Sequence, residues 1–430
     1  MWFELKLLIR YAWVIDPATG LNTMTNLLIE DGKIVKVGGG PMQADQVIDA
    51  AGLVAAPGLV DMHVHLREPG FAYKETVATG CAAAARGGVT TLVAMANTKP
   101  VTDSPELVRL VVEKAAPTGV TVLPVGAVTK GLGGAELTDF AALKQAGAPA
   151  LSDDGVPIQD EKLLRQAMEA AKAVGLPLLD HCEDKDLVQN YAVNAGPVAE
   201  KLGLPGRPAI AEEMQVERDV RLAEETGAHI HICHISTARS VDIVRQAKAR
   251  GVTVTCETCP QYFTLNQREI LEQGAMARVN PPLRTSRDVA AVLAGVKDGT
   301  IDCIVTDHAP HTAEEKARGL EKAPSGMVGL ETSLGITLTQ LYHTGEMTLP
   351  EIIAKMTVNP ARILNLDCGR LSAGSAADLT IFDPNEEWIV DAEKFASKGR
   401  NTPFNGRTLK GKVKYTIVGG KIIYQDGGEN

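Results

Sequence analysis

The chain has 430 residues, of which 45% are hydrophobic and 22% charged, and its formal net charge at pH 7 is −10. These proportions are typical of an ordinary globular protein with one large domain and an appended one, or with two to three domains. The negative charge argues against a nucleic-acid-binding or anionic-membrane-binding surface, and no stretch approaches the roughly 20 apolar residues of a membrane span.

The cysteines and the N-terminal residues indicate in which cellular compartment the protein is expected. Seven cysteines, an odd number scattered along a long chain, do not resemble a disulfide framework. The N-terminal residues lack the layout of a signal peptide, so we expect a cytoplasmic protein. Cys256 and Cys259 form a C-x-x-C, but no second Cys or His pair lies nearby, which favours packed strand cysteines over a zinc site.

The two ends of the chain carry similar β patterns. Short apolar runs at 5–9, 24–29 and 34–37 are separated by turn signals such as Asp31-Gly32. The runs at 377–382, 416–418 and 421–424 repeat this character near the C-terminus. We therefore expect residues 1–57 and 366–430 to build one small β-sandwich domain together, with residues 58–365 as a continuous insert.

The insert alternates apolar strands with helical patterns. After the strand that precedes His63, strands are predicted at 89–95, 120–128, 149–152, 177–179, 229–235, 252–256 and 301–305, and helices at 161–174, 212–226, 240–249 and 286–296. This alternation, with about eight units, predicts a (β/α)8 TIM-like barrel. A doubly wound open sheet is the alternative, but no glycine-rich dinucleotide fingerprint follows any of the strands.

The first strand of the insert ends in an unusual set of side chains. His63, His65 and Arg67 alternate along the strand and therefore share one face, with the two imidazoles about 7 Å apart. Two such imidazoles can hold a metal beyond the strand end, with the arginine beside it. The alternative is a pair of histidines that only make hydrogen bonds at a surface, but an apolar strand seldom ends in this way without a use for the residues.

Histidines gather at the predicted strand ends, where barrel enzymes carry their chemistry. Six of the nine occupy such ends, namely His63, His65, His181, His234, His308 and His311, whereas His229 and His231 are expected in the core and His343 on the surface. A catalytic zinc needs only three protein ligands, so four imidazoles with carboxylates favour two metals. The natural division gives His63, His65 and Asp307 to one metal and His181 and His234 to the other, with a bridge from the fourth strand.

Several motifs together resemble a known family. The ligand pattern is similar to that of the amidohydrolase superfamily, and longer stretches resemble dihydroorotase of the class I type. These stretches are His63-Val64-His65-Leu66-Arg67-Glu68-Pro69-Gly70, Ser152-Asp153-Asp154-Gly155, Asp180-His181-Cys182-Glu183, Asn280-Pro281-Pro282-Leu283-Arg284 and Thr306-Asp307-His308-Ala309-Pro310-His311. The resemblance runs nearly from end to end.

The resemblance implies a set of site residues. The metal ligands would be His63, His65, Asp154, His181, His234 and Asp307, and Asp307 would also be the catalytic base. The substrate contacts would be His65, Arg67, Asn97, Asn280 and His311, with backbone groups of Ser325 and Gly326. The family implies Zn²⁺, two per chain, bridged by Asp154 and a hydroxide, although manganese or cobalt also suit these ligands. Many superfamily members bridge with a carboxylated lysine that is missing here, and Asp153 is the alternative to Asp154.

The implied reaction is the reversible cyclisation of N-carbamoyl-L-aspartate to L-dihydroorotate in pyrimidine biosynthesis. Arg67 suits this small-molecule substrate because a guanidinium can hold its carboxylate bidentately. A hydantoinase or allantoinase would share the ligands without needing that clamp, and an inactive scaffold would have lost ligands. The family also implies a homo-oligomer and association with aspartate carbamoyltransferase. The 311–329 loop is expected to close over the site.

Overall fold

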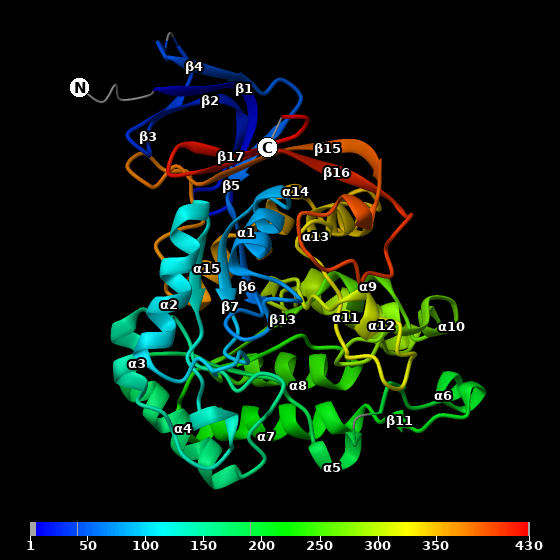
Figure 1. Ribbon diagram of the computed structural model, residues 1–430. Coiled ribbons are helices and arrows are strands. Elements are labelled where there is room, and N and C mark those ends of the chain that lie inside the picture. Colours follow the sequence, from blue (N-terminus) through cyan, green and yellow to red (C-terminus); the bar gives the residue numbers. More distant parts are fainter. Residues whose placement is uncertain (1–5, 41, 190, 429–430) are drawn as a thin grey trace.

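The terminal strands form one sheet. The computed structural model describes residues 6–40, 42–189 and 191–428, so the first five residues, examined above for a signal peptide, lie outside it. Strands from both ends share the sheet order β17-β16-β15-β5-β1-β2-β3, in which C-terminal β15 pairs with N-terminal β5, and β4 is also paired to β1. Their bounds are β1 Leu7–Asp16, β2 Leu21–Glu30, β3 Lys33–Gly38, β4 Gln46–Asp49, β5 Val54–Pro57, β15 Leu379–Ile389, β16 Thr408–Val418 and β17 Lys421–Gln425. Figure 1 shows these blue and red strands together at one end of the molecule.

The middle of the chain closes into a ring of parallel strands. Two sheets, β6-β7-β8 and β9-β12-β13-β14, are joined on one side through Leu151, which bridges Gly126 and Leu178, and on the other by the Val64–His308 bridge. The strands are β6 Leu59–Val64, β7 Val89–Ala94, β8 Thr121–Pro124, β9 Leu178–Asp180, β12 Ile230–Ile232, β13 Val254–Thr258 and β14 Cys303–Ile304. The predicted barrel is therefore confirmed, and the open doubly wound sheet is excluded.

The helices lie outside the ring (Figure 1). The longer ones are α1 Val77–Arg86, α2 Pro105–Ala115, α3 Phe140–Ala146, α4 Glu161–Val174, α7 Ile210–Thr226, α8 Ala238–Ala249, α11 Ser286–Asp298, α14 Leu349–Met356 and α15 Val358–Ile363. Further short elements are α5 Lys185–Val188, β10 Val193–Asn194, α6 Pro197–Leu202, β11 Gly206–Arg207, α9 Pro260–Thr264, α10 Glu269–Gln273, α12 Ala313–Lys316 and α13 Ser333–Thr337.

Helix α4 shows how the sequence sets these bounds. The Asp160 side chain caps its first turn by accepting from the Leu163 N–H, and Gly175 ends it in a left-handed conformation. Its buried residues, Leu164, Ala167, Met168 and Ala171, follow the spacing of one helical face. The predicted range of 161–174 is therefore confirmed.

The predicted strand at 149–152 is reduced to bridges around Leu151. Pro149 has no N–H to give to a ladder, which shortens the pairing at this position. Ser152 still donates its backbone N–H to Gly126 O at 2.9 Å, so the segment keeps its place in the ring. The residues that follow it consequently point to the same end of the barrel as those after the regular strands.

The buried apolar residues form two clusters. The larger fills the barrel and the space under its helices, and the smaller, which includes Leu7, Ile9 and Ile34, lies in the terminal sheet. Among the described residues, no helix is long and apolar enough to cross a membrane.

Gly58 joins the terminal sheet to the barrel, and a substitution there tests how tightly the two pack. A Cβ on Gly58 would lie 2.1 Å from Oγ1 and 2.7 Å from Cβ of the buried Thr90, so Gly58→Ala forces the backbone to move. We expect the free energy of unfolding to fall by about 1–3 kcal/mol in urea titrations. Gly39→Ala is the control because its Cβ would meet no atom of the described residues within 4 Å. Equal effects of the two substitutions would contradict the close packing at Gly58.

Candidate metal centre and active site

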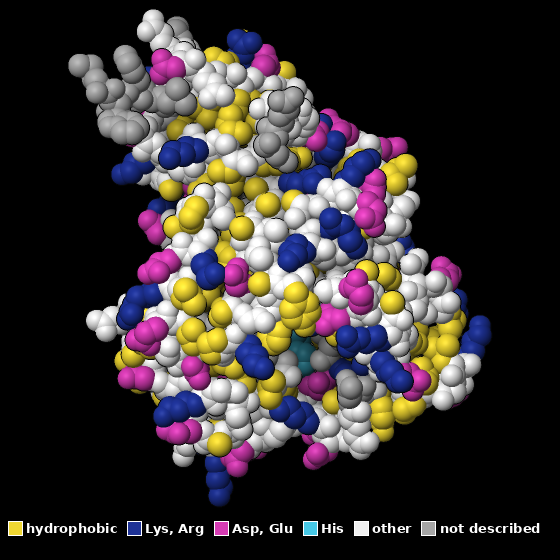
Figure 2. Space-filling view, viewed as in Figure 1, with side chains coloured by type: hydrophobic (Ala, Val, Ile, Leu, Met, Phe, Trp, Pro, Cys, Tyr) yellow, Lys and Arg dark blue, Asp and Glu magenta, His cyan; other side chains and the backbone are white. Residues whose placement is uncertain are grey.

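A pocket of about 160 Å³ opens at the carboxyl ends of the barrel strands. In Figure 2, histidine atoms are visible within an opening on this face, with basic and acidic side chains around it. The described residues that line the pocket are His65, Arg67, Asn97, Asp154, Gly155, His181, His234, Asn280, Asp307, Ala309, Ser325 and Gly326. Most of the predicted site residues are therefore brought together at one place.

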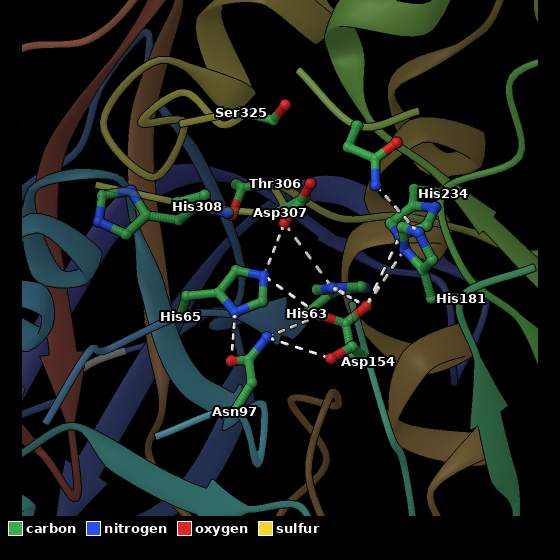
Figure 3. Close-up of polar contacts among 12 residues, drawn as sticks. His63, His65, Asn97, Asp154, His181, His234, Thr306, Asp307, His308 and Ser325 are labelled. Carbon is green, nitrogen blue, oxygen red and sulfur yellow. Dashed lines mark hydrogen bonds and ion pairs between the residues drawn. The ribbon is translucent and has the colours of Figure 1, made fainter. Parts of the chain in front are cut away.

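Asp154 lies at the centre of four imidazoles (Figure 3). Its Oδ1 is 3.6 Å from His63 Nε2, 3.6 Å from His181 Nδ1 and 3.7 Å from His234 Nε2, and its Oδ2 is 3.6 Å from His65 Nε2. Burial opposes ionisation of this carboxyl, but the neighbouring imidazoles outweigh burial and hold its pKa well below its usual range. A single carboxylate therefore faces both predicted pairs of histidines.

Asp153 points away from this cluster. Its carboxylate accepts the backbone N–H groups of Val128 at 2.7 Å and Thr129 at 3.0 Å, and also the Thr129 hydroxyl. Burial raises the pKa of Asp153, in contrast to Asp154. The geometry thus gives the two adjacent carboxylates different surroundings, and only Asp154 faces the imidazoles.

Asp307 completes the half of the cluster that contains His63 and His65. Its Oδ1 lies 2.9 Å from His65 Nε2 and 3.7 Å from His63 Nε2. Burial opposes ionisation, but the hydrogen bond with His65 and the nearby imidazoles lower the pKa of Asp307. Arg67, His234 and Asp307 all have positive φ, at 62°, 33° and 48°, an uncommon conformation for residues other than glycine that is often found at functional sites.

The donor set suits divalent metal ions. Two groups of candidate ligands share Asp154, one with His63 and His65 and one with His181 and His234, and within each group the ligand atoms lie within 4.8 Å of one another. The buried atoms His63 Nε2 and Asp154 Oδ1 have no hydrogen-bond partner among the described residues. Buried polar atoms seldom remain unpaired, so these lone pairs are ready to bind a cation.

Arg67 and Asn97 flank the pocket. The Arg67 Nε donates to Pro310 O at 3.2 Å, and burial lowers the pKa of the guanidinium. The Asn97 amide contacts a neighbour on each side. Its Oδ1 lies 2.9 Å from His65 Nδ1, and its Nδ2 donates to Asp154 Oδ2 at 3.2 Å. The amide therefore orients two members of the cluster as well as lining the pocket.

Of the remaining predicted contacts, Asn280, Ser325 and Gly326 line the pocket and His311 lies behind it. Asn280 Nδ2 is 3.1 Å from His181 Nε2, while Gly326 donates its N–H to Arg278 O at 2.9 Å. His311 does not line the pocket in this geometry; its Nε2 lies 2.9 Å from Ser325 O and 3.3 Å from the Arg67 guanidinium. Burial and neighbouring cations lower the pKa of His311 to about 2, so this imidazole is neutral.

Two buried carboxylates outside the predicted set of site residues also organise the site. Asp61 accepts the His63 N–H at 3.2 Å and the Thr306 hydroxyl at 2.6 Å, which ties the end of β6 to the end of β14. Glu257 Oε1 lies 2.5 Å from His63 Nδ1. In the sequence, Asp61 and Glu257 could each have been noticed as an acidic residue within an otherwise largely apolar strand. His308, by contrast, pairs with Glu75 at 3.3 Å and turns away from the pocket.

Comparisons with known proteins place the chain among its relatives. A family model described as "Dihydro-orotase-like" matches residues 52–240. A protein named dihydroorotase from Pelotomaculum thermopropionicum is 49% identical over 98% of this chain and 99% of its own length, and one from Clostridioides difficile is 48% identical over 97% and 99%. The chain belongs to the dihydroorotase family. The chain is also similar to the dihydroorotase from Aquifex aeolicus, which is 46% identical over 98% of this chain.

Solved structures share the fold of this dihydroorotase-family chain. An L-hydantoinase (dihydropyrimidinase) from Arthrobacter aurescens superposes with a TM-score of 0.89 at 24% identity, covering 99% of this chain and 97% of that one. A dihydropyrimidinase from Brevibacillus agri gives a TM-score of 0.84 at 24% identity, covering 98% and 95%. The expected combination of a barrel with a β domain made from both termini is thereby confirmed.

The two adjacent aspartates give a paired test of the metal centre. After chelation and reloading with Zn²⁺, Asp154→Asn should hold at least one metal fewer per chain than wild type, measured by mass spectrometry, because the shared ligand is weakened. Asp153→Asn should keep the metal but lose about 1–3 kcal/mol of stability, because it disturbs three satisfied hydrogen bonds. The reverse pattern would move the shared ligand to Asp153.

Proposed function

We propose that this member of the dihydroorotase family interconverts L-dihydroorotate and N-carbamoyl-L-aspartate, a step of pyrimidine biosynthesis. The observation that carries the proposal is the position of Arg67, a half-buried cation that lines the same pocket as the imidazole–carboxylate cluster. A cyclic amide that bears a carboxylate can place its anionic group on Arg67 and its reacting amide on the cluster. The relatives named dihydroorotase support the same substrate.

We further propose that the cluster holds two zinc ions. His63, His65 and Asp307 would hold one and His181 and His234 the other, with Asp154 shared between them. When bound, such metals polarise a carbonyl group and lower the pKa of a water molecule toward neutrality. Imidazole and carboxylate ligands also accept manganese and cobalt, and zinc is the choice that these ligands favour most.

Asp307 is proposed as the base and acid of the reaction. Its lowered pKa keeps the carboxylate ionised, so it can take a proton from the attacking water and return that proton to the departing ring nitrogen. Arg67 and Asn97 orient the substrate carboxylate, while His311, neutral and in contact with the guanidinium, keeps Arg67 in place. Asn280 and backbone groups of Ser325 and Gly326, which line the same pocket, are proposed as further substrate contacts.

The family membership supports further proposals about the whole protein. We assign residues 1–57 and 366–430 to the β domain and residues 58–365 to the catalytic barrel. We also propose a homo-oligomer that associates with aspartate carbamoyltransferase. The seven cysteines are all free thiols, which supports a reducing, cytoplasmic compartment.

Ring opening of L-dihydroorotate tests the proposed function, with dihydrouracil and hydantoin assayed beside it on zinc-loaded protein. We expect turnover of L-dihydroorotate to exceed that of either ring without the carboxylate. Arg67→Met should raise the KM for L-dihydroorotate about 10- to 100-fold, because it removes hydrogen bonds to a charged group worth about 1.5–3 kcal/mol.

Lys114→Met is the matched control for Arg67→Met. It also removes one cation, but Lys114 pairs with Glu68 at 2.6 Å and does not line the pocket. We expect its KM to equal that of wild type. Faster turnover of hydantoin than of L-dihydroorotate, or an unchanged KM in Arg67→Met, would contradict the proposed substrate.

A further inference from the structure

A chain of hydrogen bonds crosses the inside of the barrel from the metal centre. It begins at His63 Nδ1, which lies 2.5 Å from Glu257 Oε1, and continues from Glu257 Oε2 to His231 Nε2 at 3.1 Å. Thr255 Oγ1 then lies 2.8 Å from His231 Nδ1 and 2.8 Å from His229 Nε2. His229 lines a hollow at the opposite, amino-terminal end of the strands. These contacts thus connect the catalytic face to the other face of the barrel.

The strand register explains how the chain is built. His231 on β12 pairs directly with Thr255 on β13, and Glu257 follows two residues later, so Thr255 and Glu257 share a face of β13. His63 reaches the same carboxylate from β6. His63, His231 and Glu257 have no exposed surface, so no water competes for these hydrogen bonds.

The hydrogen atoms can be placed in only one consistent order when the imidazoles are neutral. Each oxygen of the Glu257 carboxylate faces one imidazole nitrogen, Oε1 at 2.5 Å and Oε2 at 3.1 Å, and a carboxylate only accepts hydrogen bonds. His63 therefore carries its proton on Nδ1 and His231 carries its proton on Nε2. His231 Nδ1 must then accept the Thr255 hydroxyl proton, and Thr255 must accept from His229 Nε2–H.

We propose that Glu257 is a positioning residue for the metal centre, with His231 and Thr255 as its support. By fixing the Nδ1–H of His63, Glu257 leaves the lone pair of His63 Nε2 directed at Asp154 and Asp307, and its charge makes that nitrogen a stronger donor to a cation. This inference rests on the proposed metal site. It assigns a function to residues that do not line the pocket.

The other candidate ligands are held differently in the part of the chain that the structure describes. His65 Nδ1 faces the neutral amide of Asn97, and the buried His234 Nδ1 has no hydrogen-bond partner. His181 Nε2 faces Asn280 at 3.1 Å, with the Glu183 carboxylate farther away at 3.6 Å. His63 thus has the shortest contact with a buried carboxylate, and its orientation should depend most on that partner.

Zinc affinity of the purified full-length protein tests this role. Glu257→Gln removes the negative charge. It also places an amide NH₂ group opposite one of the two imidazole N–H groups that donate to the carboxylate in the wild-type protein. We expect Zn²⁺ binding, measured by competition with a chromogenic chelator, to weaken about 10- to 100-fold. Thr255→Val, which removes only the supporting hydroxyl, should weaken it in the same direction by a smaller factor.

Glu75→Gln is the matched control. Glu75 is also a fully buried carboxylate and pairs with a histidine, His308, at 3.3 Å, but that pair does not face the pocket. Glu75→Gln should lower thermal stability and leave zinc affinity within about twofold of wild type. A loss of affinity equal to that of Glu257→Gln would show that any buried carboxylate has this effect and would overturn the positioning role.

Histidine ¹⁵N–¹H correlation spectra of zinc-loaded wild type provide a readout that needs no variant to fold. We expect His63 to carry a slowly exchanging proton on Nδ1, and His231 to carry one on Nε2. A bare Nδ1 on His63 would overturn the proposal. The two proposals also fail separately: absent ring opening with weakened zinc binding in Glu257→Gln would reject only the reaction, whereas normal turnover with unchanged zinc affinity in Glu257→Gln would reject only the positioning role.

Discussion

The convergence of four imidazoles on the carboxylate of Asp154 is the constraint on which the site depends. A buried carboxylate is costly unless its charge is compensated, and here the compensation comes from imidazoles on several different strands. No local segment of the chain can supply that arrangement. The ring must close before these groups can meet, so the fold and the candidate chemistry are linked.

The closure of the barrel is itself secured by buried polar contacts. Asp61 joins the ends of β6 and β14 through Thr306, and the Val64–His308 bridge completes the ring beside it. Asp307 lies between Thr306 and His308 in the sequence, and its positive φ directs its carboxylate at His65. The contacts that close the barrel therefore also position the proposed catalytic base.

Much of the fold and the candidate site could be predicted because each feature is local in sequence. The alternation of β and α patterns predicted the barrel, and the capped, amphipathic stretch of α4 gave its bounds to the residue. The gathering of histidines at strand ends predicted the cluster, since the carboxyl ends of parallel strands meet on one face. The similar β patterns of the two termini likewise predicted that these segments belong together.

The rest depended on partners far apart in the chain. Periodicity cannot say which of two adjacent aspartates faces the imidazoles, because the backbone turns after Leu151 and Asp153 finds its donors in Val128 and Thr129. The contact between Glu257 and His63 joins residues 194 positions apart. His308 shows that a position at a strand end does not by itself place a histidine in the site, because its imidazole turns away to meet Glu75.

Anomalous diffraction at the zinc edge, from crystals of the zinc-loaded protein, would locate the metal ions relative to Asp154. We expect two anomalous peaks at the carboxyl ends of the barrel strands, one beside His63 and His65 and one beside His181 and His234. Asp154 should contact both. A single peak that Asp154 does not touch, or peaks away from this cluster, would contradict the account.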